Sequence, residues 1–111
     1  MTLNEYQDLA RRTQNPKLSL VERRLHALHG IAAEAGEINA IYQKSLQGHP
    51  VDPVKVVDEM GDLIWFLAEL ADVLRIPLDN VAEHNINKLR KRYPDGFDVE
   101  HSVNRKEYQH E

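Results

Sequence analysis

A chain of 111 residues has room for one domain with a modest core, which a second subunit could help to complete. Its 14 basic and 18 acidic side chains give a formal charge of -4, which argues against general binding to nucleic acid. The chain contains no cysteine, which excludes disulfides and thiolate metal sites and leads us to expect a cytoplasmic location. Its N-terminus lacks the pattern of a signal peptide, and its most apolar run, residues 63–76, is interrupted by charged side chains, so we expect no membrane partner.

Two helices are predicted in the first half of the chain. Pairs of residues with the spacing of a capping box mark where each helix begins, Thr2 with Glu5 and Ser19 with Glu22. In the second helix, apolar residues recur at a spacing of three and four until Gly48, which indicates a long amphipathic helix with one buried face.

Two further helices are predicted in the second half. Asp52 suits the N-cap and Pro53 the first position of a third helix, which runs through Leu74. A fourth helix is expected over residues 79–92, where a turn at residues 93–96 ends it. No strand pattern of period two occurs, so the expected fold class is all-α, a four-helix bundle-type subunit completed by oligomerisation.

Two similar acidic motifs lie in the second and third helices, EAGE and EMGD, in the same register 25 residues apart. At about 100° per residue, the first acid of each motif projects within the apolar stripe of its helix and the last acid lies at the edge of that stripe. These acids are Glu34 and Glu37 in the second helix and Glu59 and Asp62 in the third. Each motif also contains a glycine, Gly36 or Gly61, which costs about 1 kcal/mol in a helix and indicates close backbone approach or packing against another chain.

The four acids predict a metal site if the second and third helices pack side by side. A desolvated carboxylate without a partner is costly, so the cluster requires positive charge. A dense set of oxygen ligands without cysteine or a nearby histidine favours Mg²⁺ or Mn²⁺ over Zn²⁺. The alternative is that the acids lie in solvent on the flanks of the helices and pair with neighbouring bases.

Donor side chains follow the acids along the chain. Asn85 and Arg92 project into the apolar stripe of the fourth helix, Lys88 lies at its edge, and Lys55 stands one turn before Glu59. Bases beside a carboxylate-bound metal are suited to a polyphosphate, because they neutralise its oxygens. The alternative is that these bases pair with the acids or extend to solvent.

Two histidines and the tryptophan are weaker candidates for functional residues. His26 and His29 stand about one turn apart, a spacing found more often in surface or core residues than in metal ligands. Trp65 is expected to project away from the carboxylate face and to pack in the core or at an interface.

The paired acidic motifs, followed by Asn85, Lys88 and the run KLRKRYPDGF, resemble the MazG-like all-α nucleotide pyrophosphohydrolase superfamily. The resemblance covers residues 1–98 as one domain and leaves residues 99–111 as a polar tail. It implies a homodimer or homotetramer that uses Mg²⁺ to split a nucleoside triphosphate substrate into monophosphate and pyrophosphate. The base, the sugar and the attacked phosphorus stay open.

The resemblance also assigns roles to individual residues. It implies that Glu34, Glu37, Glu59 and Asp62 hold the metal, with Glu34 and Glu37 as the catalytic acids, and that Lys55, Asn85, Lys88 and Arg92 contact phosphate. A non-catalytic nucleotide- or partner-binding module is the main alternative, but it would need fewer convergent acids. A di-iron bundle is disfavoured, because the sequence contains no Glu-x-x-His pair.

Overall fold

The computed structural model describes residues 1–105 and is helical, with five helices in this range. They are α1 (Leu3–Arg11), α2 (Leu20–Ser45), α3 (Pro53–Val73), α4 (Leu78–Arg92) and α5 (Val99–Val103). The all-α fold class is therefore confirmed, and no strand is present in the described residues. The chain divides into two compact units, residues 1–78 and residues 79–111.

The helix starts follow the capping signals of the sequence. The hydroxyl of Thr2 accepts a hydrogen bond from the backbone N–H of Glu5 at 3.0 Å. Ser19 and Glu22 form both hydrogen bonds of a capping box at the start of α2. Asp52 caps α3 directly before Pro53, as predicted. These bonds satisfy N–H groups that the first turn of a helix leaves free.

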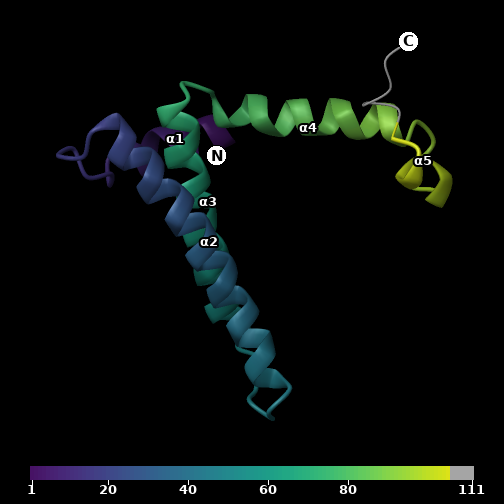
Figure 1. The fold of residues 1–111 in the computed structure, drawn as a ribbon, viewed down its shortest axis with the longest axis horizontal. Helices are drawn as coiled ribbons and strands as arrows, with labels where there is room; N and C mark the ends of the chain where they lie inside the picture. The colour runs from purple at the N-terminus through teal and green to yellow at the C-terminus, as the bar shows by residue number, and fades with distance from the viewer. Residues whose placement is uncertain (106–111) are drawn as a thin grey trace. The chain divides into compact units, whose positions relative to one another are not determined.

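The unit of residues 1–78 is built on α2 and α3, which pack side by side, with α1 against α3 (Figure 1). Its buried apolar side chains are mostly small, and this core consists of Ala10, Ala27, Ala68, Ala71 and Leu78. Many large apolar side chains on α2 and α3 are instead exposed.

The close contact between α2 and α3 occurs at Gly30. A Cβ atom at this position would overlap the ring of Phe66, so only glycine fits there. Gly36 and Gly61 have no atoms within 4 Å of where a Cβ would lie. Close backbone approach within residues 1–78 therefore does not explain these two glycines, and packing against another chain stays a prediction.

Gln7 joins α1 to the segment that follows α3. Its side chain is almost fully buried, and its Nε2 donates to Asp72 Oδ1 at 2.9 Å and to the backbone oxygen of Ile76 at 3.1 Å. Its Oε1 accepts from the backbone N–H of Leu78 at 2.7 Å. Both N–H groups and the oxygen of this buried amide are thus used, and the end of α3 is tied to α1.

The end of α3 has an unusual backbone conformation. The N–H of Arg75 donates to the oxygen of Asp72 at 3.0 Å, and the N–H of Ile76 donates to the oxygen of Ala71 at 2.9 Å. These bonds form a Schellman motif, whose left-handed residue is usually glycine. Here that residue is Arg75, with φ 57°, a conformation that costs a non-glycine residue about 1 kcal/mol.

The unit of residues 79–111 contains most of α4, together with α5. α4 ends at Arg92, as predicted, and the turn that follows has its glycine, Gly96, at φ 91°. α5 is capped by Asp98, whose carboxylate accepts from the N–H of His101 at 2.7 Å. Sequence reasoning missed this short helix in the predicted polar tail, and residues 106–111 of that tail lie outside the described part.

Candidate metal centre

Three of the four predicted acids come together between α2 and α3. Glu34 projects from α2 and Glu59 and Asp62 from α3, and each offers an oxygen within 4.8 Å of the others. Glu34 and Glu59 are partly buried, whereas Asp62 is exposed. The packing of the two helices therefore produces the convergence that the shared register of the motifs predicts.

The electrostatics of the cluster raise the pKa of Glu34 from 4.5 to about 7. The largest cause is a hydrogen bond with Glu59, which requires a proton on one of the two acids. Desolvation adds to this effect, followed by the negative charges of Glu59, Asp62 and Glu37. In addition, Oε2 of Glu34 is buried and has no hydrogen-bond partner in residues 1–105. A nearby positive charge or a bound proton would therefore stabilise Glu34.

The donor set fits a hard divalent cation. All three groups are carboxylates, the ligands that Mg²⁺ and Mn²⁺ prefer, and no ion pair in the described residues involves any of them. A cation at this position would neutralise the repulsion that raises the pKa of Glu34 and would give its buried oxygen a partner. The pairing with neighbouring bases that sequence reasoning left open is absent from the part of the chain described.

Glu37 lies outside this group of three. It follows Glu34 by three residues on α2 and is exposed, yet its charge acts on Glu34. Its role as a fourth ligand stays a prediction.

A pocket lies beside the acids, and sequence reasoning missed it. It has a volume of about 380 Å³ and is lined by Thr13, Glu34, Asp62, Trp65 and Phe66. The indole N–H of Trp65 donates to the hydroxyl of Thr13 at 2.7 Å, which fixes the ring. The expectation that Trp65 projects away from the carboxylates is therefore wrong. Trp65 and Asp62 are three residues apart, and residues at this spacing are neighbours on a helix surface. This spacing was the sequence signal that Trp65 lies beside the carboxylates.

A buried acid and a histidine form a second feature between α2 and α3. Glu69 is fully buried, and its Oε1 lies 2.6 Å from Nδ1 of His26, whose side chain is 45% exposed. The other oxygen, Oε2 of Glu69, is buried without a hydrogen-bond partner in the described residues. The His26 ring also packs edge-on against Trp65 and Phe66, with ring centroids 6.1 and 5.3 Å apart. His26 thus has a specific partner that its spacing from His29 did not indicate.

The predicted phosphate-contacting residues lie on two helices. Lys55 is exposed on α3, one turn before Glu59. Asn85, Lys88 and Arg92 lie on α4 in the unit of residues 79–111, so their approach to the acids of the other unit stays a prediction. Within their own unit, Lys88 and Arg92 are partly buried, and the guanidinium carbon of Arg92 lies 5.7 Å from the ring centroid of Tyr93.

Comparisons with known proteins identify the family of the chain. The family model of the MazG nucleotide pyrophosphohydrolase domain matches residues 23–97, which include both acidic motifs and α4. Gene 37 protein of Mycobacterium phage L5 is 36% identical over 70 residues, which are 57% of this chain and 60% of the phage protein. The chain thus spans less than two thirds of the length of that relative. No solved structure matches the chain. Because the family model covers more than half of its residues, the chain belongs to the MazG nucleotide pyrophosphohydrolase domain family.

Proposed function

We propose that the chain hydrolyses a nucleoside or deoxynucleoside triphosphate to the monophosphate and pyrophosphate, with Mg²⁺ or Mn²⁺ as cofactor. The observation that carries this proposal is the convergence of Glu34, Glu59 and Asp62 without a basic partner in the described residues. Membership of the family supports the reaction class. The cytoplasmic location expected from the sequence belongs to the same proposal. No described helix is both long and apolar enough to cross a bilayer.

Each acid has a role in this proposal. Glu34, Glu59 and Asp62 would hold the metal, with Glu37 as the additional ligand that the family resemblance implies. The bound metal would supply positive charge to the phosphate oxygens and to the transition state. Glu34 or Glu37 would orient the attacking water and accept its proton, so that water adds to phosphorus as the α–β anhydride bond breaks. Glu37 suits this role because it lies beside the cluster without being one of the three converging acids.

The bases would act on the substrate and not on the metal. Lys55, Asn85, Lys88 and Arg92 would donate to phosphate oxygens and neutralise charge that develops during bond cleavage. Lys88 and Arg92 stand four residues apart on α4, so both can face one polyphosphate.

A turnover assay tests the reaction directly. A panel of ribo- and deoxyribonucleoside triphosphates is incubated with the purified chain and Mg²⁺, and ³¹P NMR identifies the products, with ¹⁸O-labelled water to show which phosphorus is attacked. We expect monophosphate and pyrophosphate, with turnover lost in Glu59→Gln. Asp58→Asn is the matched control, because Asp58 precedes Glu59 but is exposed and outside the cluster. Binding of nucleotide without turnover across the panel would favour the non-catalytic module.

Lys88→Ala separates the substrate contacts from the metal contacts. Loss of one preorganised charge contact should lower kcat/KM by about tenfold to a thousandfold. Calorimetry in the absence of nucleotide should show little change in the affinity for Mn²⁺, because Lys88 is not one of the proposed metal ligands. Lys91→Ala on the exposed part of α4 serves as the control. Unchanged turnover in Lys88→Ala would remove this residue from the site.

We further propose that the chain is a homodimer or homotetramer. Apolar side chains on α3 remain exposed in the single chain, namely Val57 (65%), Met60 (51%), Leu67 (42%) and Ile64 (40%). A continuous apolar surface of this kind is rare on a monomer and is typical of a subunit interface. Light scattering at micromolar protein should give a mass of two or four chains, and a stable monomer would refute the proposal.

A further inference from the structure

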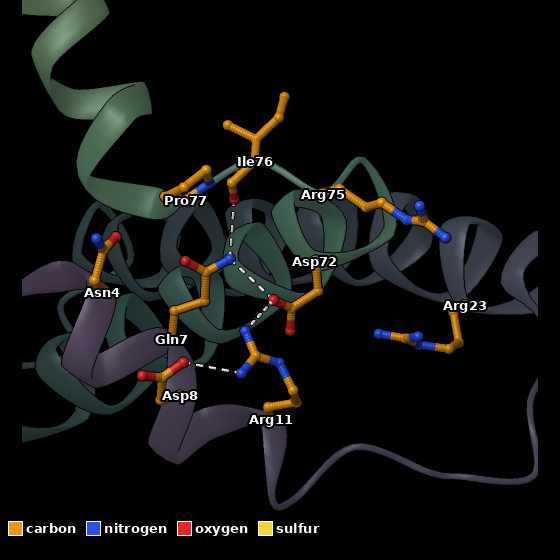
Figure 2. Close-up of a pocket in the computed structure, with 9 residues that line it drawn as sticks. All are labelled: Asn4, Gln7, Asp8, Arg11, Arg23, Asp72, Arg75, Ile76 and Pro77. Carbon is orange, nitrogen blue, oxygen red and sulfur yellow. Dashed lines mark hydrogen bonds and ion pairs between the residues drawn. The ribbon is translucent and has the colours of Figure 1, made fainter.

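A second pocket in the unit of residues 1–78 lies away from the acidic cluster. It has a volume of about 500 Å³ and is lined by residues of α1, by Arg23 near the start of α2 and by the end of α3 (Figure 2). Three arginines line it, Arg11, Arg23 and Arg75, against two acids. Asp72 of this pocket is ten residues beyond Asp62 on α3, so the two sites are about 15 Å apart along the helix.

The hydrogen-bonding capacity of Asp72 is already taken up by neighbours. Its Oδ1 accepts from Gln7 at 2.9 Å and from Arg11 at 2.8 Å, and its Oδ2 accepts from Gln14 at 2.7 Å. Arg11 also pairs with Asp8 at 2.9 Å. Both acids of the pocket are thus bound to Arg11, and Figure 2 shows these bonds on one side of the pocket.

Arg23 and Arg75 keep donors that no acid uses. Nη2 of Arg23 donates to the amide oxygen of Gln14 at 2.6 Å, while its Nε is buried and has no acceptor in the described residues. The guanidinium of Arg75 makes no hydrogen bond or ion pair within residues 1–105. A buried N–H without an acceptor is costly, so a negatively charged group bound beside Arg23 would be favourable.

The backbone also places Arg75 at this pocket. It occupies the left-handed position of the Schellman motif, where glycine is the usual residue. Backbone strain of this kind is found more often at functional sites. The end of α3 thus carries a charged side chain at a position where glycine would relieve the strain.

We propose that this pocket binds the phosphoryl group of a small phosphorylated molecule between Arg23 and Arg75. A phosphate monoester carries a charge between -1.5 and -2 at neutral pH, which matches the two guanidinium groups that have no acid partner. The planar guanidinium forms paired hydrogen bonds to phosphate oxygens. The volume lies within the range of small-molecule sites, so there is room for more than the phosphoryl group. This site is separate from the proposed hydrolysis and does not depend on it.

The test uses the full chain in EDTA, which keeps divalent metals away from the acidic cluster. Inorganic phosphate and AMP are titrated separately, and the arginine Nε–Hε signals are followed by NMR. We expect the signals of Arg23 and Arg75 to shift with both probes. Equal affinity would show that the phosphoryl group alone is recognised, and tighter binding of AMP would show that the rest of the molecule occupies the pocket.

Variants decide whether the two arginines bind the probe. Arg75→Asn removes the charge but tolerates the left-handed backbone, and Arg23→Gln removes the other guanidinium. Each should weaken phosphate binding by about tenfold or more, since a hydrogen bond between charged groups is lost. Arg24→Gln, one position from Arg23 and outside the pocket, should leave binding within about twofold. Wild-type affinity in Arg75→Asn, or shifts confined to other residues, would overturn the proposal.

Discussion

Replacing Glu34 with glutamine should stabilise the metal-free protein at neutral pH. The amide keeps the size of the side chain and can donate to Glu59, as the protonated acid does. Because the amide cannot ionise, the variant lacks the negative charge at position 34 that Glu59 and Asp62 repel. The same variant should lose the proposed activity, because it removes a proposed metal ligand.

The magnitude follows from the raised pKa of Glu34. The pKa of Glu34 is about 7 in the folded state, against the ordinary glutamate value of 4.5 for the unfolded chain, a difference of about 2.5 units. At roughly 1.36 kcal/mol per unit, this sets an upper limit of about 3 kcal/mol. Glu34 is only partly buried and solvent screens part of the repulsion, so we expect about 1 kcal/mol. Because Glu59 shares the proton, the titration belongs to the pair.

The direction of the pH dependence is fixed by the sign of the shift. The folded state holds the proton of Glu34 more tightly than the unfolded state does, so this group's stabilisation is fully present below pH 4.5. It is lost as the pH rises from 4.5 to about 7 and changes little above that. The advantage of Glu34→Gln over the wild type should therefore be small at pH 4.5 and reach its full size near pH 8.

Urea unfolding in EDTA between pH 4.5 and 8 measures this difference. Gln43→Glu, an added acid on the exposed end of α2, serves as a control for a general charge effect. Addition of Mg²⁺ should stabilise the wild type more than Glu34→Gln, since a ligand that binds only the folded state raises its stability. A variant that is less stable than the wild type in EDTA at pH 8, or a difference independent of pH, would refute the electrostatic account.

Two further predictions concern the backbone. Gly30→Ala should destabilise the fold by about 1–3 kcal/mol, because the new methyl group meets the Phe66 ring. Gly36→Ala should be neutral in a monomer or stabilise it by up to about 1 kcal/mol. Thermal unfolding compares the two variants, and equal effects would contradict the contact between Gly30 and Phe66. Arg75→Gly should be more stable than Arg75→Ala by about 1 kcal/mol, since both lose the arginine side chain but only alanine is strained in the left-handed conformation. Urea unfolding measures the difference, and equal stabilities would show that the backbone of Arg75 is not strained.

Much of the local structure of the helices follows from short-range signals in the sequence. Ser19, Asp52 and Pro53 mark the starts of α2 and α3 because each acts on the backbone within a few residues. The convergence of the acids was also predictable, because the two motifs share a register and the helices that carry them are adjacent in the chain. The short helix α5 was missed, since five residues give too few apolar positions for a helical period to show.

Features that depend on packing between helices were not predictable in the same way. Sequence reasoning singled out Gly36 and Gly61, yet the close approach occurs at Gly30, because the neighbour that decides it, Phe66, is 36 residues away in the sequence. Burial of Glu69 likewise depends on which face of α3 meets α2. A glycine or an acid within a helix therefore indicates that a contact exists but does not identify the partner.

The contrast between the two acidic features of the α2–α3 interface is the strongest argument for a ligand at one of them. Along α2, His26, Gly30 and Glu34 follow at one-turn spacing, and the ring of Phe66 packs at the middle position, between the two acidic features. The buried Glu69 has a partner within the chain, His26, which lies within hydrogen-bond distance. Glu34, Glu59 and Asp62 have no basic partner in the described residues, and the hydrogen bond with Glu59, desolvation and the neighbouring negative charges raise the pKa of Glu34. This difference between the two features supports the proposal that Glu34, Glu59 and Asp62 bind a cation from outside the chain.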